Sequence, residues 1–458
     1  MSDERELLRR TAEIAADFLE TLDERPVFPP TPVEALGEEF GGPLAEGPTE
    51  PLRVIEELAR RAEPGVTAIP GGRYFGFVTG GGLPAALAAD WLTSTWDQNA
   101  FAAVSSPAAS VIEEVAGDWL KELLGIPAHA SFAFVTGCQM AHVTCLAAAR
   151  HTVLEHAGWN VARDGLWEAP RIHIVAGAMR HVTVDRALRL LGLGTGSVVE
   201  VAADDQGRMR TDALADTLGT LTGPVIVCGQ AGEVNSGSID PLLELAELAH
   251  SGGAWLHLDA AFGIWAAASP RLRYLVAGHE QADSWAFDAH KWLNVPYDCG
   301  VAVCAHPEAH RSAMTMQAAY LSGMETGRDG ADWGPDASRR SRGITVYAAL
   351  RSLGRQGVAG LVERCCERAG QFAAAISELP GCEVLNEVVL NQVLFRFGDD
   401  ATTNAVLARV QESGEAWMSG TSWDGRAAIR LSVSSWRTTA DDIARTVAAF
   451  ERAAAVAR

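Results

Sequence analysis

The sequence is short of positive charge, and this shortage limits the partners it can have. Thirty-seven lysines and arginines stand against 58 aspartates and glutamates, giving a formal net charge of -21. A nucleic-acid binder needs a basic footprint, and no basic run occurs anywhere in the chain. Nucleic acids and anionic membranes are therefore not expected as partners, and the acidic surplus favours solubility.

Long apolar runs, paired cysteines and a leader segment are also missing. No uncharged apolar stretch is long enough to cross a bilayer, and the charged first residues lack the apolar core of a signal peptide. The eight cysteines include no CxxC pair, so no metal site is expected from their spacing. Scattered free thiols are typical of a reducing compartment, which predicts a cytoplasmic protein.

What the chain does contain, from about residue 71, is a regular alternation of short apolar runs and longer helical periods. The expected strands are residues 132–136, 171–176, 198–202, 224–229, 254–259, 284–288 and 300–305. Helices are expected between most of them, for example at 138–157, 182–191, 211–218 and 241–250. This pattern predicts an α/β fold with a mainly parallel sheet covered on both faces. Such sheets bind ligands beyond the carboxyl ends of their strands.

Two further segments flank this large domain, which is expected to span residues 71–343. Residues 1–70 carry two amphipathic helices, near 6–22 and 52–62, with a proline-rich stretch between them. These helices form either an arm whose apolar stripes pack against another surface or a hairpin that packs on its own domain. Residues 344–458 start with a long helix and continue as a smaller α+β domain.

Two strand ends carry residues suited to imine chemistry. The strand at 284–288 runs into Asp288-Ala289-His290-Lys291. Burial there can lower the pKa of the lysine, as an imine-forming nucleophile requires. Asp259 ends the strand at 254–259, and its carboxylate could pair with the N–H of a pyridinium ring. A ring whose nitrogen stays protonated acts as an electron sink. Each residue alone has an ordinary alternative, a solvated surface lysine and an aspartate that caps a turn.

Two helix starts lie at the same predicted edge of the sheet. Gly137-Cys138-Gln139 joins a strand directly to a helix. The free backbone N–H groups and the helix dipole favour a phosphate at this junction. His181 opens the helix at 182–191 and could stack on a flat ring, although a helix cap is its commoner role.

These four segments, in this order, resemble the group II decarboxylases that depend on pyridoxal 5′-phosphate (PLP). That family includes the aromatic amino acid, glutamate and diaminobutyrate decarboxylases, and the resemblance covers roughly residues 50–458. Residues 288–298 are its most specific part, and residues 74–84 and 96–99 also match. The resemblance implies a PLP-dependent transferase of fold type I and a homodimer whose second chain covers the arm. It also implies decarboxylation of an L-amino acid to an amine and CO2 through an external aldimine and a quinonoid.

The resemblance also implies roles for the residues around the cofactor ring. Lys291 would carry PLP as a Schiff base, and Asp259 would pair with the ring nitrogen. Ala261 would pack on one face of the ring and His181 on the other. Lys291, Asp259 and His181 are thus the predicted catalytic residues.

Further matches concern the phosphate and the rim of the site. Gly137, Cys138 and Gln139 would hold the phosphate, with His290 beside it, and Asn235 would line the cofactor site.

The sequence departs from the family at two points, and one further match has two interpretations. Many members place a proton-donating tyrosine on a mobile loop, but residues 321–340 contain none. Loss of a positioned acid typically costs ~10²–10⁴-fold in a proton transfer. His181 or His290 could replace it, or the reaction could end in an aldehyde, in transamination or in other Cα chemistry.

Asp288 puts an acid beside the expected phosphate, where it must be paired or point away. Arg430 matches a residue that can face the substrate carboxylate, or it forms an ion pair. A PLP-binding partner protein without turnover is the non-enzymatic alternative.

Overall fold

The structure is a computed structural model, and it describes residues 2–316 and 327–457. These residues form two compact units. The larger unit comprises Gly80–Gly370 and Asn386–Val393. The smaller comprises Met1–Thr79, Gln371–Leu385 and Leu394–Arg458.

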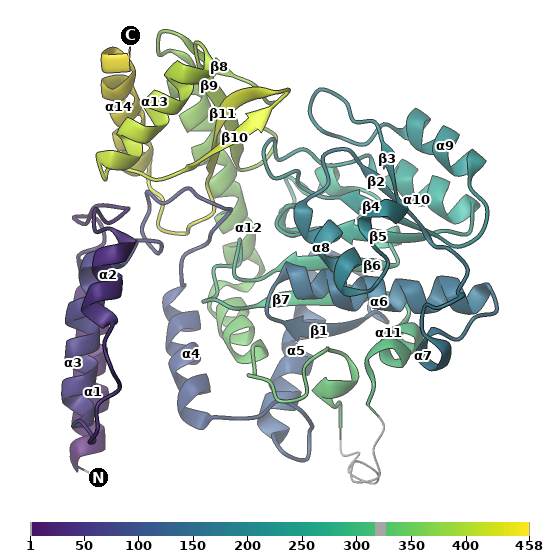
Figure 1. The fold of residues 1–458 in the computed structure, drawn as a ribbon, viewed down its shortest axis with the longest axis horizontal. Coiled ribbons are helices and arrows are strands. Elements are labelled where there is room, and N and C mark those ends of the chain that lie inside the picture. Colours follow the sequence, from purple (N-terminus) through teal and green to yellow (C-terminus); the bar gives the residue numbers. More distant parts are fainter. Residues whose placement is uncertain (1, 317–326, 458) are drawn as a thin grey trace. The chain divides into compact units, whose positions relative to one another are not determined.

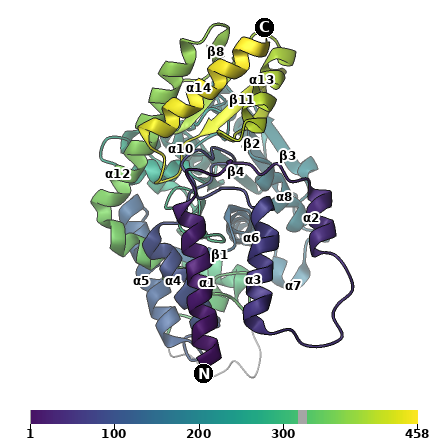
Figure 2. The ribbon, with the colours of Figure 1, turned by 90° about the vertical axis from the view of Figure 1, so that its left-hand side faces the viewer.

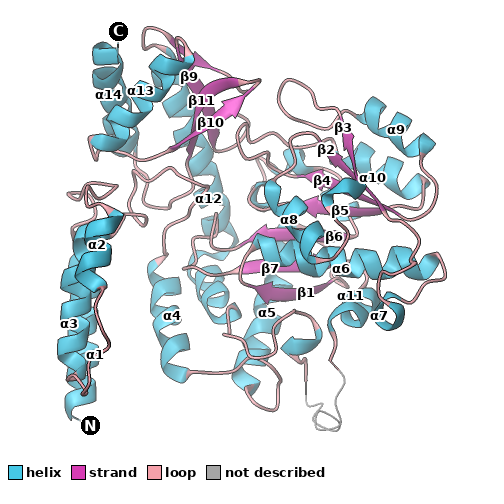
Figure 3. Ribbon diagram, in the orientation of Figure 1, coloured by secondary structure: helices cyan, strands magenta, loops and turns pink. Residues whose placement is uncertain are grey.

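A seven-stranded sheet in the order β1-β7-β6-β5-β4-β2-β3 forms the centre of the larger unit (Figures 1 and 3). Its strands are β1 Ser131–Val135, β2 His173–Gly177, β3 Val198–Val201, β4 Val225–Gln230, β5 Trp255–Asp259, β6 Ser284–Asp288 and β7 Gly300–Cys304. β7 pairs antiparallel with β1 and β6, whereas the other neighbours are parallel. The predicted mainly parallel sheet is confirmed, with one reversed strand that the apolar pattern does not reveal.

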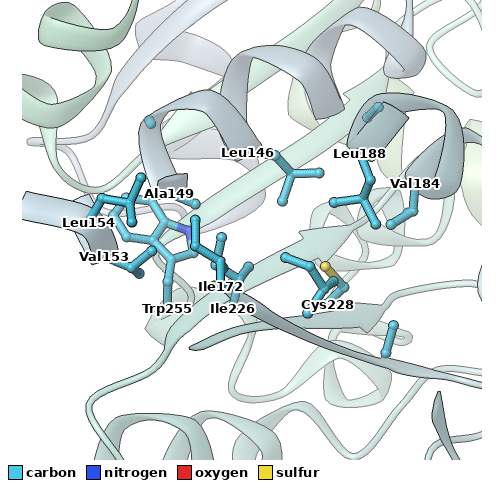
Figure 4. Close-up of a cluster of buried hydrophobic side chains, with 14 of the residues drawn as sticks. Leu146, Ala149, Val153, Leu154, Ile172, Val184, Leu188, Ile226, Cys228 and Trp255 are labelled. Carbon is cyan, nitrogen blue, oxygen red and sulfur yellow. The ribbon is translucent and has the colours of Figure 1, made fainter. Parts of the chain in front are cut away.

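Helices cover both faces of this sheet. Leu146 of α6 (Cys138–His156) and Leu188 of α8 (Val182–Leu190) pack on Ile226 and Trp255 on one face (Figure 4). Gly229 points to the opposite face, where α10 (Leu242–Ser251) packs against it. The other helices of this unit are α4 Pro84–Trp96, α5 Pro107–Leu124, α7 Val161–Asp164, α9 Thr211–Thr220 and α11 Pro307–Met314. Burial on both faces explains why the central strands are mainly apolar.

The smaller unit contains a four-stranded sheet in the order β10-β11-β9-β8. Its strands are β8 Cys382–Val384, β9 Gln392–Phe397, β10 Ser419–Trp423 and β11 Arg426–Ser432, and its later helices are α13 Asp400–Glu412 and α14 Ala440–Ala457. Phe395 packs edge-on against Phe372 and Phe450 in its core. α12 (Gly343–Ser377) continues from the larger unit into this one and is broken at Gly354, whose φ is 60°.

Three N-terminal helices belong to the smaller unit. They are α1 Ser2–Glu20, α2 Val33–Phe40 and α3 Pro51–Ala62. α1 and α3 run side by side (purple in Figure 2), and Arg10 of α1 pairs with Glu56 of α3 at 3.1 Å. In the described ranges, no helix combines the length and apolarity needed to cross a membrane.

Candidate active site

Two aspartates meet at the carboxyl edge of the large sheet. Asp259 ends β5 and Asp288 ends β6, its parallel neighbour. Both side chains lie on the face covered by α6. The backbone N–H of Cys138 donates to Asp288 Oδ1 at 2.6 Å, and Cys138 Sγ lies 3.9 Å from Asp259 Oδ1. The predicted convergence of two strand ends and one helix start is therefore present in the structure.

Lys291 lies next to Asp288. Its Nζ is 3.2 Å from Asp288 Oδ2, and only 19% of its side chain is exposed. Burial opposes the charge of the ammonium, but the negative charge of Asp288, with smaller effects from Cys138 and Asp259, raises the pKa of Lys291. The expectation of a lowered lysine pKa is wrong for the chain without cofactor. Asp288, whose carboxylate is paired rather than turned away, supplies the charge that reverses the effect of burial.

The turn that carries Lys291 is fixed by a glycine-rich segment. A Cβ on Gly80 would overlap the carbonyl oxygen of Lys291, so this close approach requires glycine. The backbone N–H of Gly81 donates to Asn294 Oδ1 at 2.9 Å. Asn294 has a left-handed φ of 56°, which asparagine tolerates better than most residues. The position of the lysine is thus determined by segments about 210 residues apart.

Asp259 is buried and ionised. Burial alone would favour its neutral form, but His142, then His181 and Lys291, hold its pKa well below the usual range. His142 Nε2 lies 3.5 Å from Asp259 Oδ2, and the backbone N–H of Ala261 donates to Oδ1 at 3.2 Å. An ionised acid at this strand end is the charge that a pyridinium N–H requires.

A buried polar chain continues behind Asp259. His142 Nδ1 is 2.9 Å from His257 Nε2, and His257 Nδ1 is 2.9 Å from Ser284 Oγ. Trp255 Nε1 donates to the same Ser284 oxygen at 2.9 Å. Sequence reasoning missed both histidines. The available signal was their spacing, because His142 follows Cys138 by four residues on α6 and His257 precedes Asp259 by two on β5.

The predicted phosphate turn is packed closely against β7. A Cβ on Gly300 would overlap the backbone of Gly137, and a Cβ on Gly137 would lie 3.4 Å from His290 Cε1. His290 Nδ1 accepts a hydrogen bond from the Cys299 backbone N–H at 3.1 Å, and burial lowers the pKa of this imidazole. Gln139 turns its amide to Thr183, donating to the carbonyl oxygen at 3.2 Å. The turn therefore offers backbone rather than side-chain groups.

The remaining predicted residues are held by local partners. His181 caps α8, with Nδ1 2.8 Å from Thr183 Oγ1. Asn235 Nδ2 donates to the buried Glu233 carboxylate at 2.8 Å. Arg430 lies in the smaller unit, in β11, and donates to Ser419 Oγ at 3.3 Å. Residues 317–326, which include the start of the loop without tyrosine, lie outside the described residues.

The buried amine, the ionised acid and the glycine turn together fit PLP. Lys291, Asp259 and the start of α6 offer an imine-forming nitrogen, a partner for the ring nitrogen and a phosphate cradle. Asp288 occupies one cradle N–H in this structure, so a phosphate there must share or displace that contact.

Comparison with known proteins gives the same answer. The chain is 26% identical to an aromatic-L-amino-acid decarboxylase of Bacillus atrophaeus, over 96% of this chain and 93% of that protein. It is 25% identical to a 4-hydroxyphenylacetaldehyde synthase of Rhodiola rosea, over 90% and 88%. The crystal structure of Oryza sativa TDC with PLP and tryptamine superposes with a TM-score of 0.93 at 22% identity, covering 100% and 98% of the two chains. This likeness confirms the predicted fold. Residues 43–398 match the pyridoxal-dependent decarboxylase conserved domain, and the chain belongs to that family of PLP enzymes.

Proposed function

We propose that this protein decarboxylates an L-amino acid to an amine and CO2, with PLP held as a Schiff base on Lys291. The observation that carries the proposal is the buried Lys291 amine near an ionised Asp259 at one sheet edge. PLP, when bound, supplies the electron sink for the charge left on Cα. Lys291 is one of two lysines in the sequence. The other, Lys121, donates to the carbonyl oxygens of Ala128 and Ala130 at 2.8 and 2.9 Å.

The proposed roles of the chain's own groups follow from their positions. Asp259 keeps the ring nitrogen protonated, because its own pKa is held low by His142. The start of α6 binds the phosphate through backbone N–H groups and the helix dipole. His181 stacks on the ring. Arg430 binds the substrate carboxylate, so Arg430→Gln should raise KM more than it lowers kcat.

Borohydride reduction followed by peptide mapping tests the proposal directly. The purified protein should be yellow, and reduction should fix the cofactor on the peptide that contains Lys291. Lys291→Ala should lose both the label and turnover. Lys121→Arg is the matched control, because it removes the only other lysine while keeping a cation at that place. A colourless wild type, or label and turnover retained in Lys291→Ala, would refute the assignment.

A second outcome, an aldehyde instead of an amine, is favoured by two relatives and by one feature of the sequence. The relatives are the 4-hydroxyphenylacetaldehyde synthase and a phenylacetaldehyde synthase of Arabidopsis thaliana, and the feature is the lack of tyrosine in residues 321–340. That reaction consumes O2 and water and releases the aldehyde, CO2, ammonia and hydrogen peroxide. Quantifying CO2, amine, ammonia and peroxide over a panel of amino acids separates the two outcomes. One amine per CO2, with no ammonia, establishes simple decarboxylation.

We further propose that the protein acts as a cytoplasmic homodimer. Leu8 of α1 and Val54 and Leu58 of α3 are 57%, 44% and 51% exposed, although apolar side chains at these positions repeat at helical spacing. A second copy of the chain would cover them. Light scattering should give twice the chain mass of 48.6 kDa. Leu58→Glu should shift the protein toward monomer, whereas Glu57→Gln, a change at the adjacent position, should not.

A further inference from the structure

We propose that Cys138, His142 and Asp259 bind a divalent metal ion of the Zn²⁺ class when the cofactor is absent, and that this ion competes with PLP. Within residues 2–316 and 327–457, these side chains form a group of metal-binding type whose ligand atoms lie within 4.8 Å of one another. All three are buried, with 6%, 0% and 5% exposure. The metal site stands on its own geometry, and only the competition rests on the proposed function.

Two of the separations between the ligand atoms match a tetrahedral zinc site. Cys138 Sγ is 3.4 Å from His142 Nε2, which is 3.5 Å from Asp259 Oδ2, and Sγ is 3.9 Å from Asp259 Oδ1. Zinc binds sulfur at about 2.3 Å and nitrogen or oxygen at about 2.0–2.2 Å. Tetrahedral angles then place the ligand atoms about 3.4–3.6 Å apart. The thiol–imidazole and imidazole–carboxylate spacings agree with these values. The sulfur and the nitrogen face different oxygens of Asp259, and the three ligand atoms lie within 4.8 Å of one another, so the carboxylate has to rotate to bring one oxygen to both.

Groups behind the ligands support them as in known metal sites. A metal-binding histidine almost always donates its second ring N–H to a polar partner. His142 Nδ1 has such a partner in His257 Nε2 at 2.9 Å, and His257 is backed by Ser284. This leaves His142 Nε2 directed at Cys138 and Asp259. The Ala261 backbone N–H orients the carboxylate.

The chemistry of the ligands selects the ion. One thiolate, one imidazole and one carboxylate favour zinc and its later transition-metal neighbours over magnesium and calcium, which prefer all-oxygen sites. The ion and PLP then exclude each other, because both need the Asp259 carboxylate. An ion bound there also places its positive charge where the protonated ring nitrogen has to lie.

Cobalt(II) is a suitable probe because its spectrum reports the ligands. Titrating Co²⁺ into the cofactor-free protein should give one equivalent of four-coordinate visible absorption with a thiolate-to-cobalt charge-transfer band. Cys138→Ser should abolish the charge-transfer band, and His142→Gln should weaken binding at least tenfold. Cys304→Ala, which removes another buried thiol, from β7, should leave the band unchanged.

One surface cluster has to be controlled for. His250 and His306 both contact Asp283, at 3.2 and 2.7 Å, and could hold an adventitious ion. His306→Gln removes that cluster and should not affect the charge-transfer band. Zinc K-edge absorption of the wild type should count one sulfur ligand, a result that depends on no variant folding. Absence of a sulfur ligand, or a band that persists in Cys138→Ser, overturns the metal site.

Adding PLP to the cobalt-loaded protein tests the competition. The thiolate band should decay as the bound-cofactor absorption rises, and the apparent Kd of PLP should increase in proportion to free Co²⁺. Full occupancy by both at once overturns the shared site. A protein that binds PLP but shows no cobalt–sulfur band refutes this inference alone. A protein that shows the band but never takes up PLP refutes the proposed function and, with it, the competition.

Discussion

Replacing Asp288 with asparagine should make cofactor capture faster at low pH. Asp288 Oδ2 lies 3.2 Å from Lys291 Nζ, and the carboxylate is only 2% exposed. At an effective dielectric constant of about 20, two unit charges at this separation attract by about 5 kcal/mol. Burial of the ammonium opposes this attraction without cancelling it, because the net effect is a raised pKa of Lys291. Asparagine removes the charge while its Oδ1 can still accept from the Cys138 N–H.

The direction of the change in capture rate follows from the protonation state in which Lys291 reacts. Only the neutral amine attacks the aldehyde of PLP, so capture accelerates with pH until the pKa of Lys291 is passed. Lowering that pKa moves the midpoint of the pH–rate profile to lower pH. One nearby opposite charge typically shifts a pKa by about 1–3 units. At a fixed pH below both midpoints, Asp288→Asn should therefore capture PLP about 10- to 1,000-fold faster.

Stopped-flow absorbance of cofactor-free protein mixed with PLP measures this profile. The midpoint reports the amine, whereas the amplitude also reflects phosphate affinity, so the two effects are separable. Asp283→Asn is the control, because Asp283 lies just before β6 at the opposite end of the strand and pairs with His306. An unchanged or raised midpoint in Asp288→Asn would show that Asp288 does not control the charge of Lys291.

Three further predictions concern the acid, the turn and a buried ion pair. Asp259→Asn should weaken PLP binding by about 10²–10⁴-fold in equilibrium titrations, since breaking a buried charge pair costs about 3–5 kcal/mol. Gly300→Ala should lower the free energy of urea unfolding by about 1–3 kcal/mol and weaken PLP binding, because its Cβ overlaps the phosphate turn. Gly219→Ala, on exposed α9 with nothing within 4 Å, should instead stabilise slightly. Arg339 pairs with the buried Glu113 at 2.6 Å. Arg339→Leu removes this partner and should lower the free energy of unfolding by about 3–5 kcal/mol in the same assay.

Sequence patterns predicted the large sheet well because burial on both faces leaves a local signal. The strand expected at 284–288 matches β6 residue for residue, and the other six strands are displaced by at most two residues at either end. The reversed direction of β7 carries no such signal, since pairing is decided by distant segments. In the smaller unit, β10 and α13 were missed. β10 alternates intermediate and exposed positions, and α13 contains several residues of weak helix propensity.

The residues of the candidate site likewise include some that local sequence patterns predict and others that they do not. Lys291, Asp259 and Gly137 could be predicted because each ends or follows a strand, and strand ends share an edge of the sheet. His142 could not, because its importance depends on α6 crossing β5 at Asp259, a contact between residues 117 apart in sequence. Ordinary helical spacing is typical of core histidines. Only the three-dimensional structure shows that this imidazole faces a carboxylate.

The contacts of Asp288 explain why two expectations from the sequence need revision. An acid beside a phosphate cradle should repel the phosphate, and a buried lysine should be neutral. In the structure the carboxylate accepts the Cys138 N–H at the start of α6 and pairs with Lys291, so each buried charge is compensated. Phosphate would bring further negative charge to the same helix start, where the Cys138 N–H is already bonded to Asp288. The acid thus stabilises the charged form of Lys291 in the chain without cofactor and holds it next to the start of α6.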